Sequence, residues 1–138
     1  MGVFGRLGRL SALTGRRIDA ELGRFGLTVA EFDVLSALRR AGEPFELTPT
    51  VLSRSLMLSP AGMTSRLDRL EQAGRVERRM DPDDRRSYLV RLSAAGRSVI
   101  DEAVSAHLAN EAAMLDALST RDLATFDRIL RLLLAQFD

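Results

Sequence analysis

The chain has 138 residues, of which 46% are hydrophobic and 28% charged, and its net charge is +1, a composition typical of a folded domain. It contains no cysteine and one histidine, His107, which argues against disulfides, thiolate chemistry, and most zinc or histidine-based catalytic sites. We therefore expect no enzyme, no cofactor and no metal site. The longest apolar run, at 129–135, is too short to span a membrane, and the first ten residues lack the apolar segment of a secretion signal. We expect a cytoplasmic protein.

Charge is unevenly distributed along the chain. Residues 48–97 contain 10 arginines and 6 acidic residues, a net charge of +4, whereas residues 98–138 contain 3 arginines and 7 acidic residues, a net charge of −4. A basic segment favours a polyanionic partner. A solvated surface that happens to be rich in arginine explains the same numbers, so charge alone does not decide between the two.

The spacing of apolar residues predicts helices in the first part of the chain. Leucines and an isoleucine recur at helical intervals over residues 6–24 and predict the first helix. A capping-box sequence opens a second helix over residues 28–40, which Gly42 ends. A short extended segment at 45–47 then precedes a third, short helix over 48–56, which begins with a threonine cap followed by proline.

The middle of the chain predicts a helix-turn-helix followed by a β-hairpin. Ser59-Pro60 repeats the cap-plus-proline signal and starts a helix that reaches Ala73. Residues 57–58 leave room only for a tight turn between this helix and the preceding one. Segments 75–80 and 87–92 flank the turn-forming sequence Asp81-Pro82-Asp83-Asp84, a pattern typical of a hairpin.

Two further helices are predicted at the carboxyl-terminal end. Ser93 caps a helix of roughly 25 residues, and Ser119 opens a last helix whose apolar face is wide. Because a small core cannot easily bury so much apolar surface, we expect a partner chain. The alternative is that these helices pack on the rest of the monomer. The apolar residues of the last helix are Leu123, Phe126, Ile129, Leu130, Leu133 and Phe137.

The helix that starts at Ser59 has two different sides. Met63, Leu67 and Leu70 form a side that can pack on a core. Small residues on the other side permit close approach to a DNA major groove, an arginine can donate two hydrogen bonds to a guanine edge, and a helix N-terminus attracts phosphate. An ordinary solvated face would have the same pattern. The residues of this second side are Ala61, Gly62, Ser65, Arg66 and Arg69.

The tip of the predicted hairpin, at 81–86, places three acidic residues beside Arg85 and Arg86. Its role is therefore geometric rather than a matter of bulk charge. The Asp84 carboxylate, two residues before Arg86, can orient that guanidinium for a narrow, electronegative minor groove. The alternative is a solvated turn whose acidic residues only favour turn geometry.

The segment SPAGMTSRLDRLEQAGRVERRMDPDDRRSYLVRLSAAG, residues 59–96, resembles the second helix and the wing of the MarR family of bacterial transcription regulators. The resemblance implies a mainly α fold with a small β-hairpin wing. It implies a winged helix-turn-helix domain over 27–97 and a helical dimerisation region formed by 1–26 and 98–138. The wing pattern of the family, Asp-x-Arg-x-x-x-Val-x-Leu-Thr-x-x-Gly, is met by Asp84, Arg86, Val90, Leu92 and Gly96, with Ser93 in place of Thr.

The resemblance also implies a function. A homodimer would bind a pseudo-palindromic operator in double-stranded DNA and repress transcription, and a small, often aromatic or anionic, effector would release it. Thr64 would contact phosphate and Arg86, held by Asp84, would enter the minor groove. Ser65 stands where many members carry arginine or another larger polar residue, which leaves the base that is read open. The expected DNA-binding residues are Ser59, Ala61, Thr64, Ser65, Arg66, Arg69, Asp84, Arg85 and Arg86. The alternative function is a winged-helix protein-protein interaction module that dimerises without binding DNA.

Overall fold

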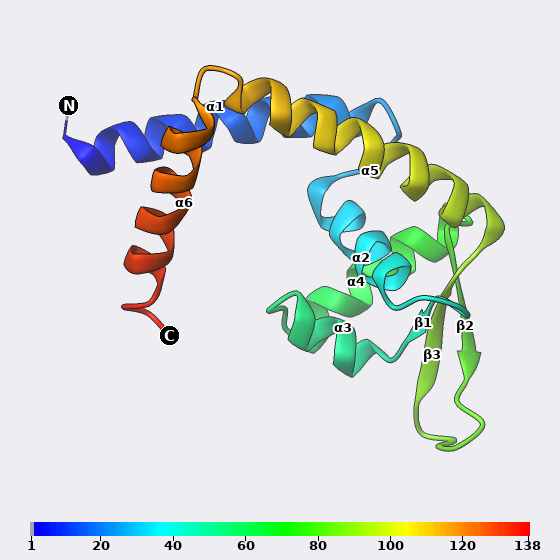
Figure 1. Cartoon of the computed structure of the whole chain (residues 1–138). Coiled ribbons are helices and arrows are strands. Elements are labelled where there is room, and N and C mark those ends of the chain that lie inside the picture. The colour runs from blue at the N-terminus through cyan, green and yellow to red at the C-terminus, as the bar shows by residue number, and fades with distance from the viewer. Residues whose placement is uncertain (1) are drawn as a thin grey trace. The chain divides into compact units, whose positions relative to one another are not determined.

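The computed structural model describes residues 2–138, and they form two compact units (Figure 1). The first unit ends at His107 and the second is Leu108–Asp138. Among the described residues, no helix is long and apolar enough to cross a membrane. In chain order the elements are α1 (Val3–Gly23), α2 (Val29–Arg40), β1 (Glu46–Leu47), α3 (Pro49–Ser55), α4 (Pro60–Gln72), β2 (Val76–Met80), β3 (Tyr88–Leu92), α5 (Ala94–Leu115) and α6 (Thr120–Leu134).

The order and type of the predicted elements are confirmed, and the predicted N-caps are present. The Thr28 hydroxyl accepts a hydrogen bond from the Glu31 amide at 3.1 Å, and Thr48 accepts one from the Val51 amide at 3.2 Å. Each of these caps satisfies a backbone donor that has no partner within its helix. The first helix begins at Val3 rather than at residue 6, because its opening segment contains glycine but no proline to stop it.

A three-stranded antiparallel sheet has the strand order β1-β3-β2. The hairpin of β2 and β3 pairs Val76 with Leu92 at its base and Met80 with Tyr88 at its far end. Val90 and Leu92 are buried while Arg91 is exposed, as the period of two predicted. In Figure 1 the hairpin extends well beyond the two-residue strand β1.

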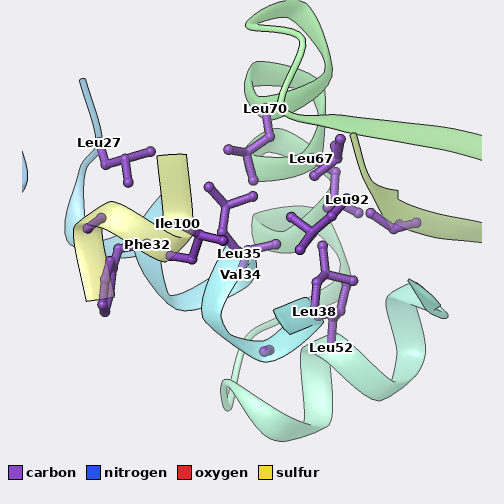
Figure 2. Packing of buried hydrophobic residues seen from close by; sticks show 14 of the residues in the cluster. Leu27, Phe32, Val34, Leu35, Leu38, Leu52, Leu67, Leu70, Leu92 and Ile100 are labelled. Atoms are coloured by element: carbon purple, nitrogen blue, oxygen red, sulfur yellow. The ribbon is translucent and has the colours of Figure 1, made fainter. Parts of the chain in front are cut away.

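The core lies where α2, α4, the sheet and the first half of α5 meet (Figure 2). Leu22, near the end of α1, is also fully buried in it. The helix-turn-helix therefore rests on a continuous apolar base rather than on its own two helices. Other buried members from these elements are Val34, Leu35 and Leu38 of α2, Met63, Leu67 and Leu70 of α4, Val90 and Leu92 of β3, and Ile100 of α5.

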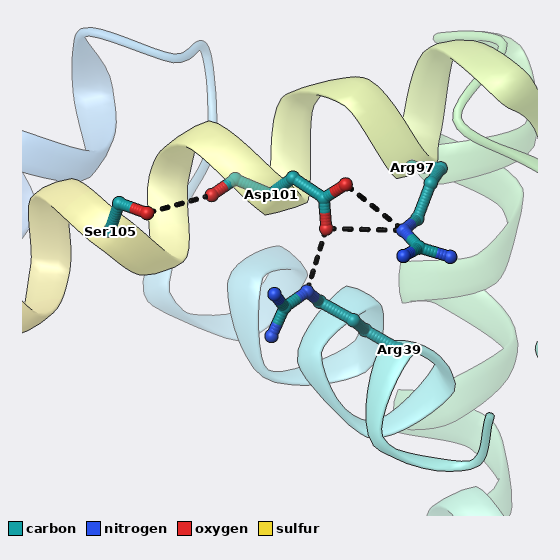
Figure 3. Close-up of polar contacts among 4 residues, drawn as sticks. All are labelled: Arg39, Arg97, Asp101 and Ser105. Carbon is teal, nitrogen blue, oxygen red and sulfur yellow. Dashed lines mark hydrogen bonds and ion pairs between the residues drawn. The ribbon is translucent and has the colours of Figure 1, made fainter.

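An ion-pair cluster joins the C-terminal end of α2 to the first turns of α5 (Figure 3). The Asp101 carboxylate accepts hydrogen bonds from Nε of Arg39 at 2.7 Å and from Nε of Arg97 at 3.0 Å. The Arg97 guanidinium also lies over the Phe45 ring, 4.1 Å from its centroid. The two arginines, with Arg39 contributing most, hold the pKa of Asp101 below its usual value. One carboxylate thus ties three segments of the first unit together.

We expect Asp101→Asn to lower the free energy of unfolding at pH 7. An ionised Asp101 stabilises the fold above the pKa of the unfolded chain, about 3.9, and this contribution is lost as the pH falls through the lower folded-state pKa. The difference between Asp101→Asn and the parent protein should therefore shrink as the pH falls below about 4. Urea unfolding at several pH values measures this difference in the free energy of unfolding. The neighbouring exposed Glu102→Gln is the control, and a difference that does not change with pH would contradict the assignment.

Candidate DNA-binding surface

Helix α4 is held by one side and leaves the other open. Ser59 is its N-cap, and the Ser59 hydroxyl accepts a hydrogen bond from the Gly62 amide at 3.2 Å. Met63, Leu67 and Leu70 are completely buried. Because these three residues recur every three or four positions, they fix the rotation of the helix about its axis. The residues between them are therefore presented in a defined direction.

The predicted contact residues of α4 lie on that open side, with one difference. Ser59, Ala61, Thr64, Ser65 and Arg69 are exposed, and the Thr64 hydroxyl donates to the Pro60 carbonyl at 3.0 Å.

Arg66 is only half-exposed, which the prediction of a fully free side did not anticipate. Its positive charge acts on Asp33 of α2. Burial raises the pKa of Asp33, and the charges of Arg66, Arg40 and His107 oppose that rise. Arg66 thus lies at the edge of the open side, near α2, because at about 100° per residue its position is only about 40° from Leu70 and about 60° from Met63 of the buried stripe.

A pocket of about 350 Å³ lies between α3 and the N-terminal part of α4. It brings Thr64 of α4 together with polar residues of α3, which the sequence reading did not include in the site. Thr50, Ser53 and Arg54 share one side of α3 because they are three and four residues apart, and this spacing is the signal that could have indicated them. The full lining is Pro49, Thr50, Ser53, Arg54, Leu58, Pro60 and Thr64.

The tip of the wing differs from the prediction in the role of Asp84. Arg85 and Arg86 are exposed, as expected. The Asp84 carboxylate, however, accepts a hydrogen bond from the Arg86 backbone amide at 3.0 Å. Asp81 accepts one from the Asp83 amide in the same way, at 2.9 Å. Since both are side-chain turns of the Asx type, the prediction that Asp84 orients the Arg86 guanidinium is corrected: Asp84 shapes the backbone that carries Arg86.

Arg78 of β2 connects the wing to α4. Its Nη2 donates to the carboxylate of Asp68 and, at 3.0 Å, to that of Glu71. Its guanidinium also lies 5.6 Å from the centroid of the Tyr88 ring on β3. Hydrogen bonds to these two carboxylates, of which the bond to Glu71 contributes more, raise the pKa of Arg78 above its usual value. The sequence reading assigned no role to Arg78.

A shallow, basic hollow lies on the wing itself. It has a volume of about 330 Å³ and is lined by Arg78, Arg79, Met80, Arg85, Arg86, Ser87 and Tyr88. Arg79 is paired with Glu46 of β1, Nε to Oε1 at 2.9 Å, and this pair lowers the pKa of Glu46. Two of the four arginines are thus engaged by acidic residues, whereas Arg85 and Arg86 at the tip are exposed.

These features define a winged helix-turn-helix protein. Helices α3 and α4 are joined by a tight turn at Met57, whose φ of 53° lies in the left-handed region, and the β2–β3 wing follows α4 directly. Such a module, with an open second helix and arginines on its wing, is one that binds DNA.

The sequence profile of the MarR family matches residues 25–87, and the chain belongs to this family of DNA-binding transcription regulators, which are not enzymes.

Three known proteins illustrate the similarity. The HTH-type transcriptional regulator PecS of Dickeya dadantii is 38% identical over 122 residues, which are 88% of this chain and 74% of PecS. The HTH-type transcriptional repressor Rv2887 of Mycobacterium tuberculosis is 31% identical, covering 88% of this chain and 86% of the repressor. A crystal structure of a mutant MarR from E. coli complexed with operator DNA has a TM-score of 0.81 and 27% identity, covering 97% of this chain and 99% of that one.

Proposed function

We propose that the protein is a homodimeric transcriptional repressor that binds a pseudo-palindromic operator, with α4 in the major groove and the wing in the minor groove. The observation that carries the proposal is the exposed set of polar residues and arginines on α4 and the wing, on a fold whose E. coli relative is complexed with operator DNA. The name of the M. tuberculosis relative, a repressor, supports the direction of regulation.

On α4, the small exposed residues at the start of the helix favour close approach to base edges. Ala61 and Ser65 are short enough to let the helix enter a major groove about 12 Å wide. Ser59 and Thr64 lie at the N-terminal end, where the helix dipole and a hydroxyl suit phosphate. Arg69 and the half-exposed Arg66 follow one turn later, and arginine is suited to a guanine edge or to the backbone.

On the wing, Arg85 and Arg86 stand at the end of a hairpin, where a side chain can enter a narrow groove. Asp84 contributes through the turn that it forms with the Arg86 amide. A carboxylate at this position does not add attraction for DNA, so its place in the site is structural.

In the proposed homodimer, the two ends of the chain form the interface. Residues 1–26 and 98–138 would form the dimerisation region and residues 27–97 the DNA-binding domain. Exposed apolar side chains support this proposal, among them Phe4 at 80% and Leu134 at 62% of full exposure. A small aromatic or anionic effector that releases DNA belongs to the proposal through the resemblance to the family. A cytoplasmic location also belongs to it, because the DNA that a bacterial regulator binds lies in the cytoplasm.

Arg69→Ala and Arg86→Ala test the function. A bound duplex is first selected from random sequences, and an inverted repeat with half-sites about 10 bp apart is expected from a dimer of this class. Each substitution should weaken binding by about 1–3 kcal/mol, roughly 5- to 150-fold. Fluorescence anisotropy measures the affinity.

Arg40→Ala is the matched control, because Arg40 is exposed at the last position of α2, outside the proposed contact residues and the dimerisation region, and its loss changes the net charge equally. Light scattering verifies that the oligomeric state is unchanged. If both site variants bind the selected duplex as tightly as the parent protein, DNA recognition by this surface is rejected and the protein-protein interaction module becomes the better hypothesis.

A further inference from the structure

The wing meets α4 through a partly exposed charge contact that neither the family pattern nor the charge of the surface requires. Asp68 and Glu71 are acidic residues on the helix proposed to enter the major groove. By charge alone they repel DNA. Both are directed to the same cation, Arg78, since residues three apart on a helix lie on one side.

Arg78 is well placed to act as a fixed point for the hairpin. Its side chain is 22% exposed, compared with 53% for Arg79, the next residue on the same strand. It stands on the same side of β2 as the buried Val76 and two residues before the strand ends. Beyond Met80 the chain turns through the tip that carries Arg85 and Arg86.

The three partners of Arg78 belong to α4 and to the wing, and the inference concerns the position of the wing relative to α4. Asp68 and Glu71 belong to α4, and Tyr88 belongs to β3, paired with the last residue of β2. A planar guanidinium that donates to two carboxylates and stacks on a ring has a defined orientation. The contact therefore resists rotation of the hairpin about its base.

We infer that Arg78 is a positioning residue: together with Asp68 and Glu71 it fixes the wing against α4, so that Arg86 reaches the minor groove while α4 occupies the major groove. This inference rests on the proposed function. Asp68 and Glu71 then favour DNA binding indirectly, by positioning the wing, although their negative charges repel DNA directly.

The double variant Asp68→Asn with Glu71→Gln tests the inference through that difference in sign. Both side chains are about half-exposed, so the amides should be tolerated by the fold. Removing two negative charges from the DNA-binding helix would tighten binding if only net charge mattered. We expect it to weaken operator binding about 5- to 20-fold. Glu77→Gln, an exposed acidic residue of β2, is the control and should bind equally well or slightly more tightly.

A double-mutant cycle with Arg86→Ala shows whether the effect passes through the wing arginine. The Asp68→Asn, Glu71→Gln pair should have little further effect once Arg86 is absent. Arg78→Lys keeps the charge but loses the planar guanidinium that lies beside the Tyr88 ring, so it should weaken operator binding in the same direction as the pair of amides. Urea unfolding and light scattering verify that each variant is folded and has the parent's oligomeric state.

Two results would overturn the inference in distinguishable ways. If Arg86→Ala weakens binding but the amide pair tightens it, or weakens it equally with and without Arg86, the positioning role is wrong and the proposed function stands. If Arg86→Ala has no effect on affinity, the wing contact itself is wrong, and the role of Arg78 is overturned with it.

Discussion

Gly96→Ala should destabilise the first unit by about 3 kcal/mol or more, a large part of the stability of a small domain. A Cβ at this position would lie 1.9 Å from the Arg75 carbonyl oxygen and 2.8 Å from its carbonyl carbon. Both are backbone atoms between α4 and β2, so the clash cannot be relieved by turning a side chain. Either α5 or the turn after α4 must move.

The same region holds the hydrogen bonds that such a movement would break. The Ser93 amide donates to the Arg75 carbonyl at 3.1 Å, and the Ser93 hydroxyl donates to the Gly74 carbonyl at 2.6 Å. The Ser93 hydroxyl also accepts from the Gly96 amide at 3.0 Å. Close approach of α5 to residues 74–75 therefore depends on the missing side chain of Gly96, which gives the glycine in the wing pattern a packing reason.

Urea unfolding followed by circular dichroism measures the effect, with Gly8→Ala as the control. Gly8 is a helical glycine of α1 whose added Cβ meets nothing within 4 Å. Alanine should stabilise that position by about 0.5–1 kcal/mol, since it favours the helix. Equal unfolding midpoints for the parent protein and Gly96→Ala would show that the turn after α4 yields easily, contrary to this expectation.

The elements of the fold were predictable because their signals are local. Thr48-Pro49 and Ser59-Pro60 each combine a cap with a proline, and both helices begin there. The alternation of the buried Val90 and Leu92 with the exposed Arg91 likewise matches the side of β3 that the sequence indicated as buried. Each of these signals lies within a few residues of the structure that it predicts.

Contacts between elements were not predictable in the same way. The bonds of Arg78 to Asp68 and Glu71 depend on the angle between β2 and α4, and periodicity within either element carries no information on that angle. The half-burial of Arg66 depends on the neighbouring α2. Asp84 was assigned to the correct partner residue but to the wrong group, because an Asx turn to the backbone and an ion pair to the guanidinium share one sequence spacing.

Leu133→Glu should convert the homodimer into monomers. Helix α6 has no fully buried residue in the structure, and Leu133 is 37% exposed. At about 100° per residue, Leu133 falls within one apolar stripe, and a second copy of this chain is the proposed partner. The other members of the stripe within α6 are Leu123, Phe126, Leu130 and Leu134.

The expected magnitude follows from symmetry. In a two-fold dimer each substitution occurs twice, and burial of a leucine contributes about 1.5–3 kcal/mol. Loss of two such contributions raises the dissociation constant at least about 100-fold, and a carboxylate in an apolar interface adds a further cost. Sedimentation velocity at micromolar concentration measures the change.

Leu132→Glu separates the loss of this stripe from the general effect of a charge on α6. Leu132 is the adjacent residue, 60% exposed, and on the opposite side of the helix, so this variant should remain a dimer. Operator affinity should fall only for Leu133→Glu, because a monomer reaches one half-site and loses the gain from simultaneous binding at two. It should recover as protein concentration is raised, since the DNA-binding lobe is unchanged. A dimeric Leu133→Glu would reject this stripe of α6 as the dimer contact, whereas monomers for both variants would show that a charge on either side of α6 disrupts the dimer and would reject the assignment to this stripe.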